Sequence, residues 1–99
     1  MSHERYRDWL EEALDDYFAA RDLYNLRRYS KAAFFSHQAC EKALKALLIK
    51  RAKRYSPVHS VLKLMEEVKR VIDVPEELVW KAQYLDRFFI PTRYPNAWP

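Results

Sequence analysis

The distribution of apolar and polar residues is most informative between residues 30 and 53, where it predicts one long helix. This stretch contains no Pro or Gly, and no β-branched residue before Ile49, so nothing in it opposes helix formation. Drawn as a helix, it places apolar residues over roughly half of its circumference: Ala32, Ala33, Phe35, Ala39, Cys40, Ala43, Leu44, Ala46 and Leu47. So wide an arc must contact more than one neighbour. We therefore predict that this helix is the centre of the fold, with its alanines allowing another helix to approach closely.

Helical periodicity also precedes and follows the central stretch. A first helix is predicted from about Arg5 to Asn25, because apolar residues recur every three or four positions from Trp9 to Tyr24. The connection at residues 26–29 is short, which predicts an antiparallel hairpin with the central helix. A third helix is predicted from Val58 or His59 to Ile72, with Leu62, Met65, Val68 or Lys69, and Ile72 facing inward.

A fourth helix is predicted to begin at Pro75, a residue that suits the first position of a helix. Its apolar face would hold Val79, Trp80, Gln83 or Tyr84, and Phe88. Residues 89–99 form a predicted extended tail, because the last ten residues include three prolines. The sequence therefore predicts one all-α domain, an up-and-down antiparallel bundle of four main helices with an extended Pro-rich C-terminal tail.

Composition narrows the classes of function. The chain has 99 residues and a formal net charge of +4, a moderately basic balance that is compatible with nucleic acid or an acidic partner. It contains no glycine, which excludes glycine-rich phosphate loops. The charged N-terminus predicts neither a signal peptide nor a membrane anchor. The single Cys40, expected as a small buried apolar residue, favours a reducing compartment, and we expect the protein to be cytoplasmic.

The run AAFFSHQACEKALKALLIKR, from Ala32 to Arg51, resembles the signature helix of the HEPN domain family. His59 near the start of the next helix and Arg93-Tyr94-Pro95 late in the chain match the same family. The resemblance implies a bundle that is often dimeric and is commonly encoded beside a minimal nucleotidyltransferase, as half of a toxin–antitoxin pair. It also implies that many members are metal-independent ribonucleases with an Arg-x(4–6)-His motif, whereas others serve as binding modules.

The family pattern continues after Arg-Tyr-Pro into a further helix that packs on the bundle, and this chain ends at Trp98-Pro99. Either the sequence is truncated or a partner supplies the missing surface. We expect a second copy of the chain to cover the aromatic residues near Phe88, Tyr94 and Trp98.

Arg54 and His59 have the Arg-x4-His spacing and are the candidate catalytic residues. An imidazole can exchange a proton with a ribose hydroxyl near neutral pH, and a guanidinium can hold the phosphate. The alternative is structural, with Arg54 as a cation at a helix end and His59 as a polar residue that begins the third helix. The structural alternative is favoured, since such spacing arises often by chance in a chain with 18 Lys and Arg.

Four other residues are candidates for binding phosphate or nucleic acid: Lys42, Lys45, Arg93 and Tyr94. We favour instead a solvated face for Glu41, Lys42 and Lys45, because charge runs on helices are usually exposed. The tail aromatics could stack on RNA bases, although packing on the bundle or on a second subunit is preferred. His37 is expected to be a hydrogen-bonded core residue, and no metal site or cofactor is predicted.

Three hypotheses of function follow from the sequence. The first is a dimeric interaction module that pairs with a nucleotidyltransferase-type antitoxin. The second is a metal-independent endoribonuclease that uses Arg54 and His59. The third, a nucleotide-binding protein, has the least support, because only scattered cations could bind phosphate.

Overall fold

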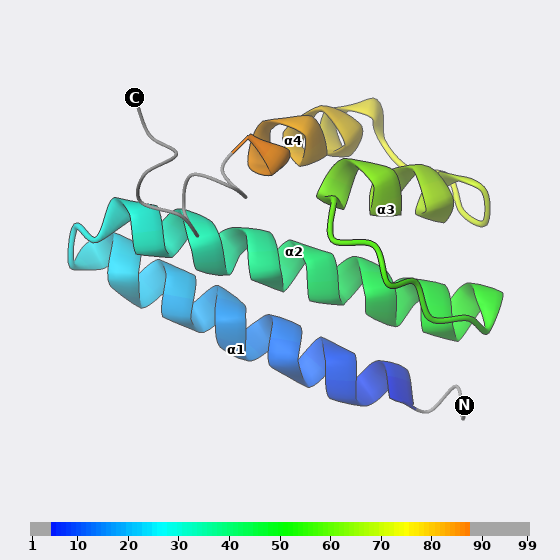
Figure 1. Ribbon diagram of the computed structural model, residues 1–99, viewed down its shortest axis with the longest axis horizontal. Coiled ribbons are helices and arrows are strands. Elements are labelled where there is room, and N and C mark those ends of the chain that lie inside the picture. The colour runs from blue at the N-terminus through cyan, green and yellow to red at the C-terminus, as the bar shows by residue number, and fades with distance from the viewer. Residues whose placement is uncertain (1–4, 88–99) are drawn as a thin grey trace.

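The computed structural model describes residues 5–87 and contains four α-helices in that range (Figure 1). These are α1 (Tyr6–Asn25), α2 (Tyr29–Ala52), α3 (Val61–Lys69) and α4 (Glu76–Asp86). The predicted all-α class is confirmed, and the first two helices lie within one residue of their predicted bounds. The predicted Pro-rich tail lies outside the described residues. None of the four helices is long and apolar enough to cross a lipid bilayer.

The first two helices form the predicted antiparallel hairpin. They pack through small buried side chains, Ala13 and Ala20 on α1 and Ala32 and Ala46 on α2. The connection is tight, and Arg27 within it adopts a left-handed backbone with φ 62°. Glycine would accept that conformation more readily, but the chain contains none. The hairpin is therefore held by close helix contact and not by a favourable turn.

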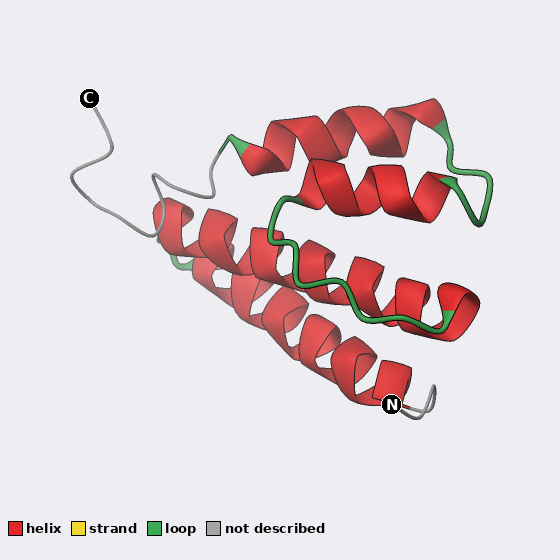
Figure 2. Ribbon diagram, turned by 45° about the vertical axis from the view of Figure 1, so that its right-hand side comes forward, coloured by secondary structure: helices red, strands yellow, loops and turns green. Residues whose placement is uncertain are grey.

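Helix α2 is the centre of the described fold, as its wide apolar arc predicts. It contacts α1 on one side and α3 and α4 on the other. Figure 2 shows the α1–α2 hairpin and the α3–α4 pair as two layers, with the segment between α2 and α3 running back along α2. Ser56 in this segment is almost completely buried. The segment therefore covers a flank of α2 that would otherwise be open to solvent.

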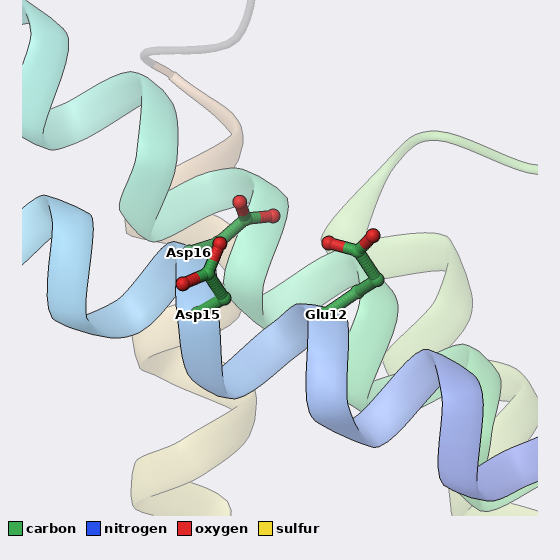
Figure 3. Close-up of side chains that lie close together, drawn as sticks. All are labelled: Glu12, Asp15 and Asp16. Carbon is green, nitrogen blue, oxygen red and sulfur yellow. The ribbon is translucent and has the colours of Figure 1, made fainter.

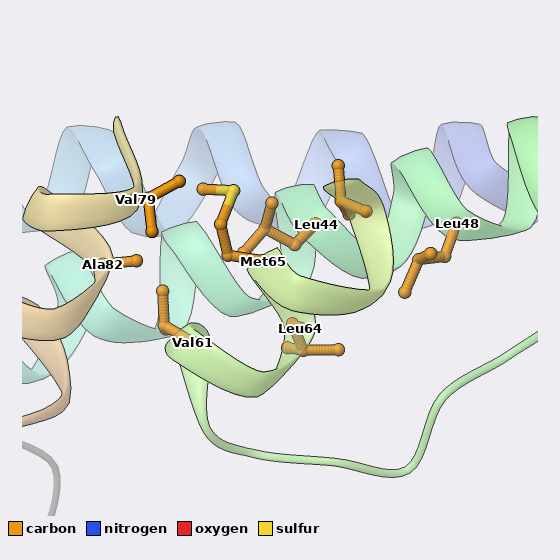
Figure 4. Packing of buried hydrophobic residues seen from close by; sticks show 8 residues of the cluster. Leu44, Leu48, Val61, Leu64, Met65, Val79 and Ala82 are labelled. Atoms are coloured by element: carbon orange, nitrogen blue, oxygen red, sulfur yellow. The ribbon is translucent and has the colours of Figure 1, made fainter. Parts of the chain in front are cut away.

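The apolar core lies between α2 and the α3–α4 pair (Figure 4). It is built from side chains that recur at helical spacing on these three elements: Leu44, Leu48, Val61, Leu64, Met65, Val68, Val79 and Ala82. Cys40 and Leu47 pack against its edge, half-buried. Because α1 contributes no buried residue to this cluster, the core holds the second layer on α2, and the alanine contacts hold α1.

Helix α3 is shorter than the predicted helix, which extended from Val58 or His59 to Ile72. It begins after Ser60, whose backbone is extended and whose hydroxyl accepts a hydrogen bond from the Lys63 N–H. This is an N-cap interaction, and it fixes the helix start. At the other end the Arg70 N–H bonds the Glu67 carbonyl three residues back, so the last turn tightens and the helix ends.

The predicted apolar face of α4 is wrong in part. Val79 is buried as predicted, but Trp80 is 70% exposed and Tyr84 also faces solvent. Ala82 takes their place in the core. A small residue there lets α4 lie close to α3, and Asp86, one turn further along the same stripe, reaches the start of α3. Phe88 lies outside the described residues.

Candidate functional site

Three polar side chains of α2, His37, Glu41 and Lys45, are buried at successive four-residue intervals. This spacing places them along one face of the helix. The interpretation of Glu41 and Lys45 as a solvated face is wrong, since Lys45 is only 1% exposed. The physical reason is tertiary: α1 and the segment after α2 close over this flank. The polar face of α2 is therefore an internal network.

The Glu41 carboxylate is the hub of this network. Its Oε2 lies 3.1 Å from Lys45 Nζ and 3.0 Å from His59 Nδ1. A carboxylate can only accept, so Nδ1 of His59 carries the proton in this contact. The His59 side chain is otherwise 61% exposed. Glu41 thus joins α2 to the residues that precede α3 and fixes the tautomer of the histidine.

Two aromatic rings complete the enclosure of Lys45. Its Nζ lies 5.6 Å from the centre of the Trp9 ring and 5.2 Å from that of Tyr55. Both distances lie within the range of cation–π attraction. The two rings contact each other at a centroid separation of 5.5 Å. Because the ammonium is paired and covered, Lys45 is not available to a phosphate ligand in this conformation.

Lys42 is also occupied, by carboxylates of α1. Its Nζ lies 2.7 Å from Asp16 Oδ2 and 3.9 Å from Glu12 Oε2. Glu12, Asp15 and Asp16 form an acidic group whose ligand oxygens lie within 4.8 Å of one another (Figure 3). Such oxygens suit a hard divalent cation, but the Lys42 ammonium already balances the buried member, Asp16. The pair serves to join α1 to α2.

Arg54 engages a different carboxylate from His59. Its Nη2 donates to Glu67 Oε1 at 2.9 Å, and the Ser56 hydroxyl donates to Glu67 Oε2 at 2.9 Å. Burial alone would raise the pKa of Glu67, but the Ser56 and Arg54 hydrogen bonds and the charges of Arg54 and Arg70 outweigh it. The pKa of Glu67 is therefore held below its usual value. Arg54 and His59 thus lie near the two ends of one segment with separate acceptors, and their catalytic assignment stays a prediction.

Asp86, at the end of α4, was not predicted as a site residue. It accepts hydrogen bonds from the Ser60 hydroxyl at 2.5 Å and from the Val61 and Leu62 N–H groups at 2.7 and 3.1 Å. His37 Nε2 lies 3.1 Å from its Oδ1. Burial acts to raise the pKa of Asp86, but these donors outweigh it and hold the pKa below its usual value. The carboxylate thus caps α3 and joins it to α2 and α4.

An apolar groove runs between α1 and α2, with a volume of about 340 Å³. Its lining is mostly small or aliphatic: Leu10, Ala13, Leu14, Tyr17, Ser36, Ala39, Cys40 and Ala43. Burial, with the charge of Asp86, raises the pKa of the Cys40 thiol to about 11. A groove with so few polar groups offers little to a charged ligand and suits another apolar surface.

The remaining candidates, Arg93 and Tyr94, lie outside the described residues, as do Phe88 and Trp98. Within residues 5–87, two carboxylates that organise this region, Asp86 and Glu67, were not predicted from the sequence. Asp86 contacts residues 24 to 26 positions earlier in the chain, so no local pattern reports it. The network of α2 did leave a signal, since His37, Glu41 and Lys45 share the i, i+4, i+8 spacing of one helix face.

Comparison with known proteins identifies the type of fold. The model of the HEPN domain family matches residues 6–99. A search of curated proteins found no match. Among solved structures, the chain is similar to that of TT1696 from Thermus thermophilus, with 43% sequence identity and a TM-score of 0.88. The alignment covers 96% of this chain and 74% of that one.

Proposed function

This chain belongs to the HEPN domain family, and on that premise we propose that it is a dimeric interaction module. It would form one half of a toxin–antitoxin pair whose other half is a nucleotidyltransferase. The observation that carries this proposal is a contrast between the two flanks of the α1–α2 hairpin. On one flank the charged groups are paired with one another, whereas on the other an apolar groove is open.

The charged flank supports an architectural role. Three candidate cations of the described residues, Lys42, Lys45 and Arg54, lie within 3.1 Å of Asp16, Glu41 and Glu67 respectively. At Lys45, which is enclosed, binding a phosphate would require the contact with Glu41 to break. Removing the partner of a buried charge costs roughly 3–5 kcal/mol. The most buried of these cations, Lys45, is therefore better suited to holding the fold than to binding a ligand.

Co-expression tests the pairing. The proposed partner, a nucleotidyltransferase-type protein carrying an affinity tag, should retain the chain through purification and gel filtration as a complex of defined mass. An unrelated tagged nucleotidyltransferase is the control and should retain none. The chain alone should be a dimer by light scattering at micromolar concentration. If the two proteins elute separately and the chain alone is monomeric, the proposal is wrong.

A metal-independent endoribonuclease is the second candidate, and one observation favours it. His59 is largely exposed while Glu41 holds its Nδ1, an arrangement that suits a histidine acting as a general acid or base. Arg54 would have to exchange Glu67 for the RNA phosphate. We propose this activity as secondary, because it needs that rearrangement.

The test is incubation with structured and single-stranded RNA in the presence of a chelator. Cleavage should fall by roughly 10²-fold in His59→Ala and also fall in Arg54→Ala. Lys63→Ala, which removes an exposed cation nearby, should leave the rate unchanged. No cleavage by the wild type, or equal rates in all four proteins, excludes the ribonuclease role.

A further inference from the structure

Helix α1 carries a stripe of exposed apolar side chains along the groove. Leu10, Leu14, Tyr17 and Phe18 all face solvent, and Leu14 is 50% exposed. They recur at intervals of three and four residues, so they lie on one face of the helix. Scattered exposed apolar residues are normal on a protein surface, but a continuous stripe beside a groove marks an interaction site.

The groove and the stripe are complementary in shape. The floor of the groove is made of small residues, Ala13 on α1 and Ser36, Ala39 and Ala43 on α2. Its rim is made of three larger side chains of the stripe, Leu10, Leu14 and Tyr17. Small residues permit close approach, and the large side chains of a second helix can then fill the space above them. A surface that carries both parts can pack against a copy of itself.

We propose that a second copy of the chain docks on this surface, with the two α1 helices antiparallel across a two-fold axis. The inference rests on the dimer of the proposed function and adds the surface through which it forms. In a two-fold interface the same patch contacts itself, so a residue before the axis meets one equally far after it. The charged residues of α1 can then indicate which residues of the two helices lie opposite one another.

An axis at the level of residue 16 sets opposite charges against each other along the stripe. In that register Glu11 lies opposite the partner's Arg21, and Leu14 lies opposite the partner's Phe18. By symmetry each pair occurs twice. An axis at the level of residue 14 would instead set Arg7 against the partner's Arg21, and like charges across an interface are unfavourable. All the α1 side chains named in this comparison are exposed in the single chain. Their contacts there are with neighbours on the same helix, such as that of the Arg21 guanidinium with the Phe18 ring. Charge complementarity therefore favours a second copy as the occupant.

Light scattering and sedimentation at a series of concentrations, with the full chain, test the surface. Leu14→Glu should weaken the dimer at least tenfold, because it places a charge in the apolar contact. The matched control is Leu78→Glu on α4, where the leucine is 46% exposed, and it should leave the dimer unchanged. Circular dichroism should show the same helix content in both, since neither side chain is buried.

Charge reversal tests the register. Glu11→Arg and Arg21→Glu should each weaken association by roughly three- to tenfold, because each sets like charges opposite one another twice. The double variant Glu11→Arg/Arg21→Glu restores opposite charges and should recover most of the wild-type affinity. Failure of the double variant to recover, with both single variants weakened, would overturn the register.

The remaining outcomes separate this inference from the proposed function. A wild-type dimer that Leu14→Glu leaves intact overturns the surface but not the dimer. A wild-type monomer overturns both. If Leu14→Glu instead abolishes capture by the nucleotidyltransferase, the partner protein occupies the groove.

Discussion

Glu41 and His59 lie 18 residues apart in the chain, and their side chains meet at 3.0 Å between Oε2 and Nδ1. The contact ties the middle of α2 to the residue just before the cap of α3. It also brings an exposed imidazole to a buried carboxylate that already holds Lys45. One carboxylate oxygen thus serves the stability of the helix packing and the orientation of the histidine.

Removing the charge of Glu41 should destabilise the protein strongly. Glu41→Ala leaves the Lys45 ammonium buried between two rings with no carboxylate beside it, and we expect a loss of roughly 3–5 kcal/mol. Urea unfolding followed by circular dichroism measures it. The control Glu66→Ala changes an exposed carboxylate on α3 and should have little effect.

A second substitution separates charge from packing. In Glu41→Ala/Lys45→Met, the uncompensated charge is gone while much of the lysine stem is retained. The double variant should be more stable than Glu41→Ala alone, because the buried charge accounts for most of the loss. If both proteins unfold at the same urea concentration, the unpaired charge of Lys45 does not account for the instability of Glu41→Ala.

Asp86 should make stability depend on acid pH. Its pKa is lowered in the folded state, so folding is favoured by its ionised form. A group of this kind contributes its full stability above the unfolded pKa, near the usual 3.8, and loses it as the pH falls through the lower folded pKa. We therefore expect stability to fall below about pH 4. Glu67 acts in the same direction, because its pKa is also lowered.

The variant Asp86→Asn measures how much of this pH-dependent stability comes from Asp86. The amide can accept fewer of the hydrogen bonds from Ser60, Val61 and Leu62 and carries no charge, so we expect a loss on the order of 2 kcal/mol near neutral pH. The difference in stability between the variant and the wild type should become smaller as the pH falls below about 4. Thermal unfolding at a series of pH values measures both effects. If the difference in stability stays constant with pH, the hydrogen bonds of Asp86 stabilise the fold independently of its charge.

The helices and their order could be predicted from periodicity, because α1 and α2 are long and their apolar residues recur regularly. The network could not. Glu41 and Lys45 look like an exposed pair at i and i+4, and they are buried because Tyr55 and Ser56 fold back along α2. Nothing local to α2 reports that path. Likewise, Trp80 is the larger apolar residue, yet it is 70% exposed whereas Ala82 is buried in the core.

Glycine at the end of α2 should stabilise the fold. Lys53 follows the helix in a left-handed conformation with φ 58° and ψ 33°. A side chain in that region is unfavourable by roughly 1–2 kcal/mol, and glycine avoids it. Lys53→Gly also loses the hydrogen bond from Nζ to the Lys50 carbonyl, which is exposed and contributes little. We expect a net gain of about 0.5–1 kcal/mol.

Two companion variants test the cause. Arg27→Gly, at the other left-handed position, should give a similar gain. Lys50→Gly, in the helical part of α2, should instead lose about 1 kcal/mol. Thermal unfolding of the three variants measures the differences. If Lys53→Gly destabilises the protein as much as Lys50→Gly does, the backbone conformation is not the source of strain.

Cys40 reports on the groove between α1 and α2. Its pKa is raised from 9.0 to about 11 by burial and by the charge of Asp86, which lowers the thiolate fraction near pH 8 by roughly a hundredfold. Alkylation should therefore be slow, and faster in Asp86→Asn.

If a second copy covers the groove, the rate of Cys40 alkylation should fall further as protein concentration rises. Leu14→Glu should remove that concentration dependence. Mass spectrometry of the alkylated protein measures the rate, and alkylation as fast as that of an unfolded control in urea would contradict the placement of Cys40.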